Sequence, residues 1–398
     1  MQLTAVHIPQ RCLAPHVAAA QAYDVTLDGG LVSAIQASAS PATSILLPAL
    51  VDAHVHLDKN YSVQQSGAAC GDLFTAIAMI QDVLRDATAA DFAARMQRAL
   101  NNAWHNGTRA MRTHIDWMQA SAPAALAVVE QLAAAWQDKV QLQWAALTPI
   151  DILATPAGAA IAAQVAQRGG VLGAFVYRND DLQHKLREVF TLARAHGLAL
   201  DFHTDEGLDL DATSLASIAD LTIEFGLQGR VVCGHACSLS VQNTADTEAT
   251  LARCAAAGIH LVALPTTNLY LQGSWAGTPL ERGITRVREA RAAGVGVSIA
   301  TDNVQDAFYP YGNYDLIATW SLGVQLAHLA PALDWIDTVT TAPASALGLA
   351  WDGRIAVGCP ADLLQLHAAD EYALVGAGSS VARTVIRQGA RLAPPTEY

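Results

Sequence analysis

Two histidines separated by one residue stand in the segment LLPALVDAHVHLDK, residues 46–59. Side chains alternate between the two faces of a β-strand, so His54 and His56 should point the same way at the end of an apolar strand. Buried imidazole nitrogens need polar partners, and a divalent metal ion would provide one. Two hydrogen-bonded structural histidines are the commoner explanation of an isolated pair, so the rest of the chain must decide.

Further groups able to bind a metal or move a proton follow three other apolar segments. They are His203 with Thr204, Asp205 and Glu206 after residues 198–202, His235 at the end of residues 231–235, and Asp302 with Asn303 after residues 295–301. Three imidazoles and one carboxylate suit a single Zn²⁺ or Fe²⁺ ion with an open position for water, whose pKa the ion lowers from about 15.7 towards about 7. Glu206 would carry a proton from this water to a ring nitrogen of the substrate, and His235 would orient or polarise the hydroxide.

These residues need a scaffold that brings the ends of several strands together. Eight apolar segments predict strands, at residues 46–54, 108–115, 140–147, 171–177, 198–203, 231–235, 259–264 and 295–301. Alanine- and leucine-rich segments with helical spacing lie between them. This alternation predicts an α/β fold with a parallel (β/α)8 TIM-type barrel, in which functional residues collect at the carboxyl ends of the strands.

The two ends of the chain differ from this pattern. Residues 1–44 and 354–398 consist of short alternating stretches with turn residues such as Asp28-Gly29-Gly30, which indicate small strands and hairpins. We expect these two segments to pair into a small β-sandwich domain, and residues 45–353 to form the catalytic barrel domain.

The composition favours a soluble protein. The chain has 398 residues, of which 52% are hydrophobic and 15% charged, and its formal net charge is −13. That charge argues against a nucleic-acid surface and does not favour an anionic membrane. No apolar segment has the length of a transmembrane helix, and the first residues lack a signal-peptide pattern. We therefore expect a cytoplasmic protein whose partner is a small-molecule substrate.

The six cysteines fit reduced thiols better than a disulfide framework, because the chain is large and shows no secretory signal. Cys233 and Cys237 are spaced CxxxC without a second pair, which favours a structural role over a zinc knuckle. The chain contains no Gly-Lys dipeptide for a P-loop and no GxGxxG segment, so neither phosphate-binding motif is predicted.

Longer segments resemble the metal-dependent amidohydrolase superfamily and, within it, the cytosine deaminases. Besides the strand-end residues, the resemblance rests on QSGAACGDLF (65–74), GTRAMRTHID (107–116), NLYLQG (268–273), RGITRVREA (282–290) and TDNVQDAFYPYGNYDL (301–316). It implies a metal site whose ligands are His54, His56, His203 and Asp302. The catalytic residues that it implies are Glu206, which transfers protons, His235, which positions the water, and Asp302. It also implies Fe²⁺ or Zn²⁺ as the metal and a homo-oligomer as the assembly.

One metal ion is expected, and not two. A binuclear subtype of this superfamily bridges two ions through a carboxylated lysine on the fourth strand. The chain has three lysines, and none is placed there: Lys59 follows the first predicted strand, Lys139 precedes the third, and Lys185 lies in the helix after the fourth.

Three positions depart from the cytosine deaminase pattern. The glutamine that recognises the pyrimidine in those enzymes follows the third strand, where this chain has Thr148-Pro149-Ile150-Asp151. After the eighth strand, Asn303 replaces an aspartate and Phe308 a tryptophan. Because loss of a hydrogen-bonding group changes selectivity strongly, we expect an altered substrate, with Pro149, Ile150, Asn303 and Phe308 as candidate substrate contacts.

The expected activity is hydrolytic deamination of a small N-heterocycle that bears an exocyclic amine. Cytosine, isocytosine, creatinine-like rings, aminotriazines and pterins are all candidates. A second hypothesis is hydrolysis of a cyclic or N-acyl amide on the same metal site, and a third is an inactive barrel that serves as a binding protein.

Three residues near the predicted site keep open roles. Lys59 either contacts the substrate or pairs with a carboxylate such as Asp58, and the structural pairing is favoured. Trp117 and Tyr177 follow the second and fourth predicted strands, where they would line the pocket or only pack at the barrel mouth.

Overall fold

The computed structural model describes residues 1–69 and 71–393, and a parallel barrel forms its larger part. Its strands are β5 (Leu50–Val55), β6 (Thr108–Asp116), β7 (Gln141–Pro149), β8 (Val171–Val176), β9 (Leu200–Thr204), β10 (Val231–His235), β11 (His260–Ala263) and β12 (Gly296–Ile299). They pair in chain order from β5 to β12, all in parallel. The Asp302 N–H donates to the His54 carbonyl at 2.9 Å, which links the last strand to the first. The predicted (β/α)8 fold is confirmed.

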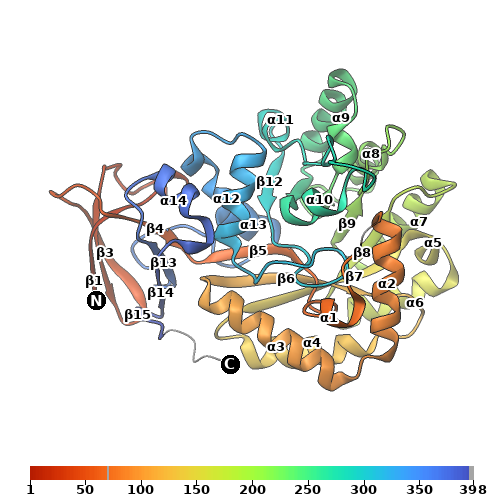
Figure 1. Cartoon of the computed structure of the whole chain (residues 1–398), viewed down its shortest axis with the longest axis horizontal. Helices are drawn as coiled ribbons and strands as arrows, with labels where there is room; N and C mark the ends of the chain where they lie inside the picture. The colour runs from red at the N-terminus through yellow and green to blue at the C-terminus, as the bar shows by residue number, and fades with distance from the viewer. Residues whose placement is uncertain (70, 394–398) are drawn as a thin grey trace.

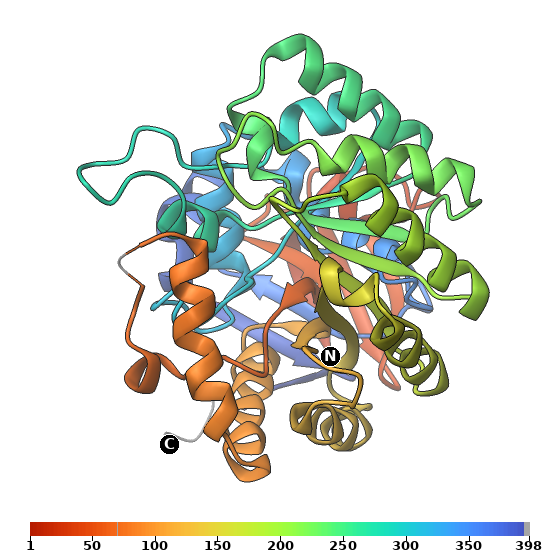
Figure 2. The ribbon, with the colours of Figure 1, turned by 90° about the vertical axis from the view of Figure 1, so that its right-hand side faces the viewer.

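Helices surround the barrel on its outside, as Figure 2 shows. The α-helices are α1 (Val63–Ser66), α2 (Leu73–Asp86), α3 (Ala89–His105), α4 (Ala124–Trp136), α5 (Ile150–Leu153), α6 (Pro156–Gln167), α7 (Leu182–His196), α8 (Ser214–Glu224), α9 (Thr244–Ala256), α10 (Pro265–Leu271), α11 (Val287–Ala292), α12 (Leu316–Leu326), α13 (Thr341–Ala346) and α14 (Glu371–Ala377). The 3₁₀ helices are η1 (Gln10–Cys12), η2 (Cys237–Ser240), η3 (Ala332–Val339) and η4 (Gly378–Ser380). None of the helices in the described residues is both long and apolar enough to cross a bilayer.

Helix α3 shows why these segments form helices here. Thr88 and Asp91 form a reciprocal capping box at its start, which satisfies two backbone donors that a helix otherwise leaves free. Phe92, Met96 and Leu100 recur at helical spacing and are buried. Packing of such apolar faces against the outer surface of the strands forms the main hydrophobic core.

The two ends of the chain form a second, mixed sheet at the left of Figure 1. Its strands are β1 (Gln2–His7), β2 (Tyr23–Asp28), β3 (Leu31–Ala37), β4 (Ser44–Pro48), β13 (Leu363–Leu366), β14 (Arg383–Arg387) and β15 (Ala390–Arg391). The order across the sheet is β15-β14-β13-β4-β1-β2-β3, so N- and C-terminal segments pair as expected. The division into domains at residues 44 and 354 stays a prediction.

The single strand expected over residues 46–54 is wrong, because two strands occupy this stretch. β4 pairs with β1 and β13 in the terminal sheet, whereas β5 begins the barrel. The chain changes sheets at Ala49, whose N–H donates to Asp362, while the next N–H, from Leu50, donates to Gly107. A continuous apolar run suits a buried strand in either sheet, so the sequence pattern does not mark the break.

The interior of the barrel is unusually polar. Alternation along β6 and β9 points Arg112 and Asp201 inward, where Arg112 Nη1 lies 2.9 Å from Asp201 Oδ2. Gln143 accepts two further hydrogen bonds from Arg112. Burial raises the pKa of Asp201 to about 6, although the Arg112 guanidinium opposes this shift. A buried ion pair therefore lies beneath the residues at the strand ends.

The Arg112–Asp201 pair generates a stability prediction. Arg112→Met leaves a carboxylate without its partner in the barrel interior, and loss of one member of a buried pair typically costs about 3–5 kcal/mol. Arg168→Met is the matched control, because Arg168 pairs with Glu130 on the surface, where a pair contributes about 0–1 kcal/mol. Urea unfolding should show a large decrease in the free energy of unfolding for Arg112→Met only. Equally small decreases for both variants would contradict this account.

Candidate metal centre and active site

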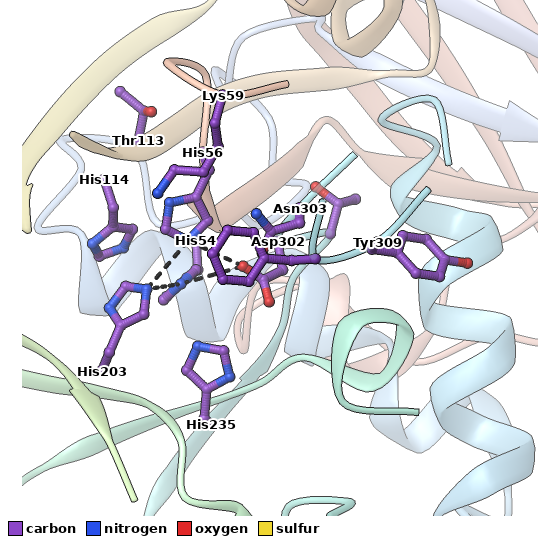
Figure 3. Close-up of polar contacts among 12 residues, drawn as sticks. His54, His56, Lys59, Thr113, His114, His203, His235, Asp302, Asn303 and Tyr309 are labelled. Atoms are coloured by element: carbon purple, nitrogen blue, oxygen red, sulfur yellow. Dashed lines mark hydrogen bonds and ion pairs between the residues drawn. The ribbon is translucent and has the colours of Figure 1, made fainter. Parts of the chain in front are cut away.

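Four side chains that could bind a metal meet at the carboxyl ends of β5, β9 and β12 (Figure 3). His203 Nε2 lies 3.1 Å from His54 Nε2 and 3.2 Å from His56 Nε2. Asp302 Oδ1 lies 3.6 Å from His54 Nε2 and 3.2 Å from His56 Nε2. All four side chains are buried. Residues from three distant parts of the sequence thus bring three imidazoles and one carboxylate together around His54 and His56.

The geometry of these atoms fits a bound divalent ion. Ligand nitrogens lie about 2.0–2.1 Å from Zn²⁺, and a tetrahedron of that radius has edges of about 3.4 Å. The four separations given above, 3.1–3.6 Å, are close to that edge length. His54, His56 and His203 are among the groups able to hold a metal. Burial lowers the pKa of all three imidazoles well below the usual range, so they are neutral and able to ligate.

The backbone adopts a left-handed conformation at two of the residues around this cluster. Asp302 and His235 have φ values of 59° and 68°, in the left-handed region that costs non-glycine residues about 1–3 kcal/mol. Gly234 precedes His235, and a Cβ there would lie 2.8 Å from His54 Cε1. The close approach of β10 to His54 therefore requires glycine at this position.

Glu206 and His235 lie beside the four ligand groups. His235 Nδ1 is 3.1 Å from Asn268 Oδ1 and 3.4 Å from Glu206 Oε1. A proton on Nδ1 that is donated to Asn268 leaves Nε2 as an acceptor. Burial and the Asp302 charge raise the pKa of Glu206 well above its usual value. Asp205, by contrast, accepts N–H bonds from Ser214 and Leu215 at the start of α8.

A pocket opens over this cluster and receives side chains from the strand ends and from α2. Its lining consists of His56, Lys59, Leu73, Ile77, Ile80, Gln81, Asp116, Met118, Leu147, Pro149, Phe175, His203, Glu206, His235, Asn303 and Phe308. Three expected substrate contacts, Pro149, Asn303 and Phe308, belong to this lining. The fourth, Ile150, is fully buried in the apolar core and is not part of the lining. Contact with the substrate stays a prediction for each of them.

His114 is a member of the cluster that the sequence pattern did not single out. Its ring centroid lies 4.0 Å from that of His54 and 4.8 Å from that of His203. It stands on β6 between Arg112 and Asp116, which share its face of the strand. In the segment RTHID, polar residues alternate with Thr113 and Ile115, and this pattern could have placed His114 on the same face as Arg112 and Asp116.

The three residues with open roles now have places. Lys59 pairs with Asp116, at 2.6 Å, and not with the adjacent Asp58. Trp117 is buried against Trp144, away from the pocket lining. Tyr177 donates its hydroxyl to Asp209 and lines a wider outer groove of about 890 Å³, which shares Leu73 and Glu206 with the pocket.

The described cysteines are free thiols, in line with the expectation of reduced cysteines. They are Cys12, Cys233, Cys237, Cys254 and Cys359, and Cys70 lies outside the described residues. Burial raises the pKa of Cys233 and Cys237 well above the usual range, which disfavours the thiolate that would bind a metal.

The cluster predicts one divalent ion per chain. Elemental analysis of purified protein should find about one equivalent of Zn²⁺ or Fe²⁺, because the four ligand groups enclose one point. His203→Asn should lose most of this metal while retaining the circular dichroism spectrum of the fold. The control is His184→Asn on the exposed face of α7, which should bind metal normally. Two tightly bound ions per chain would contradict a mononuclear site.

Comparisons with known proteins find relatives that match most of this chain. The chain is 36% identical over 367 residues to a pterin deaminase of Rhizobium rhizogenes, covering 91% of this chain and 84% of that protein. A 5-methylcytosine deaminase from Klebsiella pneumoniae, liganded with phosphonocytosine, superposes with a TM-score of 0.86 at 24% identity and covers 100% of this chain and 99% of that one. An N-isopropylammelide isopropylaminohydrolase from Burkholderia multivorans superposes with a TM-score of 0.76 at 24% identity, and the match covers 98% of each chain.

A family model extends the evidence from single relatives to the whole family. The model described as "Amidohydrolase family" matches residues 80–392, which is most of the barrel and the C-terminal strands of the second sheet. The superfamily that the strand-end residues resemble is thereby confirmed. The chain belongs to the amidohydrolase family.

Proposed function

We propose that this protein is a metal-dependent deaminase that hydrolyses the exocyclic amine of a small N-heterocycle, with a pterin as the first substrate to test. The observation that carries this proposal is the cluster of His54, His56, His203 and Asp302, of which His56 and His203 line one pocket together with Glu206. The identity to the pterin deaminase of Rhizobium rhizogenes supports the choice of substrate.

The chain's own residues can perform the proton transfers of this reaction. An ion held by the three histidines and Asp302 would supply a nucleophilic water at neutral pH. Glu206 would accept a proton from that water and pass it to a ring nitrogen, and His235 would direct its free Nε2 at the water. The water oxygen bonds to the amine-bearing carbon, the C–N bond breaks, and ammonia leaves as the ring gains a carbonyl.

The walls of the pocket suit a flat ring. Leu73, Ile77 and Ile80 approach from α2, while Phe175 and Phe308 come from β8 and from the loop after β12. Aromatic and aliphatic walls bind the faces of a heterocycle through apolar contact. The polar groups in the lining, which include Glu206, His235 and Asn303, are then left to contact its edges.

Substitution of Glu206 tests the assignment of the proton carrier. Glu206→Gln should lower kcat by about 10²–10⁴-fold with metal content unchanged, because the amide cannot accept the proton. Glu248→Gln, on the exposed face of α9, is the control and should keep full activity. The measurement is ammonia release from pterin by the metal-loaded enzyme. Full activity of Glu206→Gln would contradict the proposed role.

A substrate panel separates the proposal from its alternatives. Ammonia release is measured with pterin, isocytosine, cytosine, creatinine and an aminotriazine, with the metal-free enzyme as control. We expect metal-dependent release from at least one ring amine. If all ring amines are inert and cyclic or N-acyl amides are cleaved, the protein is an amide hydrolase. Absence of bound metal and of any turnover would indicate a binding protein.

A further inference from the structure

Lys59 is a buried cation in the wall of the pocket. Its side chain is 3% exposed, and its Nζ lies 2.6 Å from Asp116 Oδ1 and 5.5 Å from the centre of the Phe308 ring. Lys59, Asp116 and Phe308 all line the pocket that contains Glu206. Removal of an ammonium group from water is costly, but the charges of Asp116, Asp58 and Asp306 all favour the ammonium form of Lys59. A fixed positive charge beside a carboxylate therefore forms part of the pocket wall.

Backbone anchors hold both members of the pair in place. Ser62 Oγ donates to the Lys59 carbonyl at 2.6 Å. The Asp116 N–H donates to Asp58 Oδ2 at 2.9 Å, and Arg95 Nη2 donates to the Asp58 carbonyl at 3.0 Å. Lys59 follows β5 and Asp116 ends β6, and these two strands are neighbours. The donor and the acceptor are thus preorganised, one in the turn after β5 and one at the end of β6, as a recognition site requires.

The pair retains capacity for further hydrogen bonds. A lysine ammonium carries three donors, and a carboxylate accepts about four hydrogen bonds. Among residues 1–69 and 71–393, the one hydrogen-bond acceptor found for Lys59 Nζ is Asp116 Oδ1. Donors and an acceptor that can bind a ligand therefore stand side by side in the lining of the pocket.

The end of the neighbouring strand β7 lacks such a group. The family resemblance leads us to expect a glutamine after β7, whose amide would offer one donor and one acceptor to the substrate. Pro149 lines the pocket at that point and has neither a side-chain polar group nor an N–H. Asn303 donates its Nδ2 to Asp306 Oδ2 at 2.7 Å, so part of its amide is already engaged. Lys59 and Asp116 offer the same combination of one donor and one acceptor from the ends of β5 and β6, beside β7.

We infer that Lys59 and Asp116 recognise the lactam edge of the substrate, in which a ring carbonyl stands next to a ring N–H. Lys59 Nζ donates to the carbonyl oxygen, and Asp116 accepts from the N–H. The substrate class, which rests on the proposed deaminase function, is a 2-amino-4-oxo pyrimidine ring, either single or fused. In such a ring the amine-bearing carbon adjoins the lactam nitrogen on one side, and its second ring nitrogen is left for Glu206.

A pair of substrates that differ at this edge tests the inference. Pterin carries the lactam, whereas 2-aminopteridine lacks the carbonyl and the N–H. Sites built to hydrogen-bond a substrate group reject analogues without it by about 10⁴-fold or more, so wild-type kcat/KM should strongly favour pterin. Lys59→Met should lower kcat/KM for pterin by about 10–100-fold, the effect of one charged hydrogen bond, and change that for 2-aminopteridine by less than about threefold.

Two further variants keep the test independent of folding. The double variant Lys59→Met/Asp116→Asn avoids an unpaired buried carboxylate and replaces the single variant if that one does not fold. It should reduce the preference for pterin over 2-aminopteridine by at least the 10–100-fold expected for Lys59→Met. Lys185→Met removes the lysine of a Lys–Asp pair of equal length, 2.6 Å, outside the pocket, and should keep the wild-type ratio of the two kcat/KM values. Metal content and circular dichroism are measured for every variant.

Three outcomes would overturn the inference, and they can be told apart. Equal losses on both substrates, with metal retained, would make Lys59–Asp116 a purely structural pair. Wild-type enzyme that deaminates 2-aminopteridine as fast as pterin would reject lactam recognition while the proposed deaminase function stands. Wild-type enzyme that releases ammonia from no ring amine would reject the proposed function, and lactam recognition with it.

Discussion

His203 Nε2 and Asp302 Oδ1 each lie 3.1–3.6 Å from Nε2 of His54 and Nε2 of His56, in a part of the barrel from which water is largely excluded. Lone pairs directed at one another in such an interior repel, and polar atoms buried without partners are costly. A single cation at their centre converts this repulsion into attraction. Neutral histidines are favoured by the same burial, so the feature that makes the cluster unfavourable alone also makes it a good metal site.

The closure of the barrel and the assembly of the site depend on the same backbone. The hydrogen bond from Asp302 N–H to the His54 carbonyl joins the last strand to the first, and both residues belong to the ligand cluster. Beneath them, Asp52 accepts from Thr301 through N–H and hydroxyl donors at 3.1 and 2.6 Å. Burial still raises the pKa of Asp52 to about 7. The polar interior therefore fixes the strands that carry the ligands.

The strand-end residues could be predicted because their signal is local: an apolar run followed by histidine or a carboxylate is visible in a few residues. The break at Ala49 could not, since an apolar run suits either sheet. The ion-pair partner of Lys59 could not be predicted from the sequence either. Lys59 pairs with Asp116, 57 residues away, and not with its neighbour Asp58, because β5 and β6 lie side by side in the barrel. The position of His114 beside His54 follows only when the alternation of side chains along β6 is combined with the pairing of β6 to β5.

Anomalous X-ray diffraction from crystals of the native enzyme, recorded on both sides of the zinc and iron absorption edges, tests the central claim most directly. A mononuclear centre predicts one anomalous peak per chain, about 2.0–2.2 Å from Nε2 of His54, His56 and His203 and from the Asp302 carboxylate. A peak elsewhere, for example between His114 and Asp201, or two peaks within the cluster, would contradict the account.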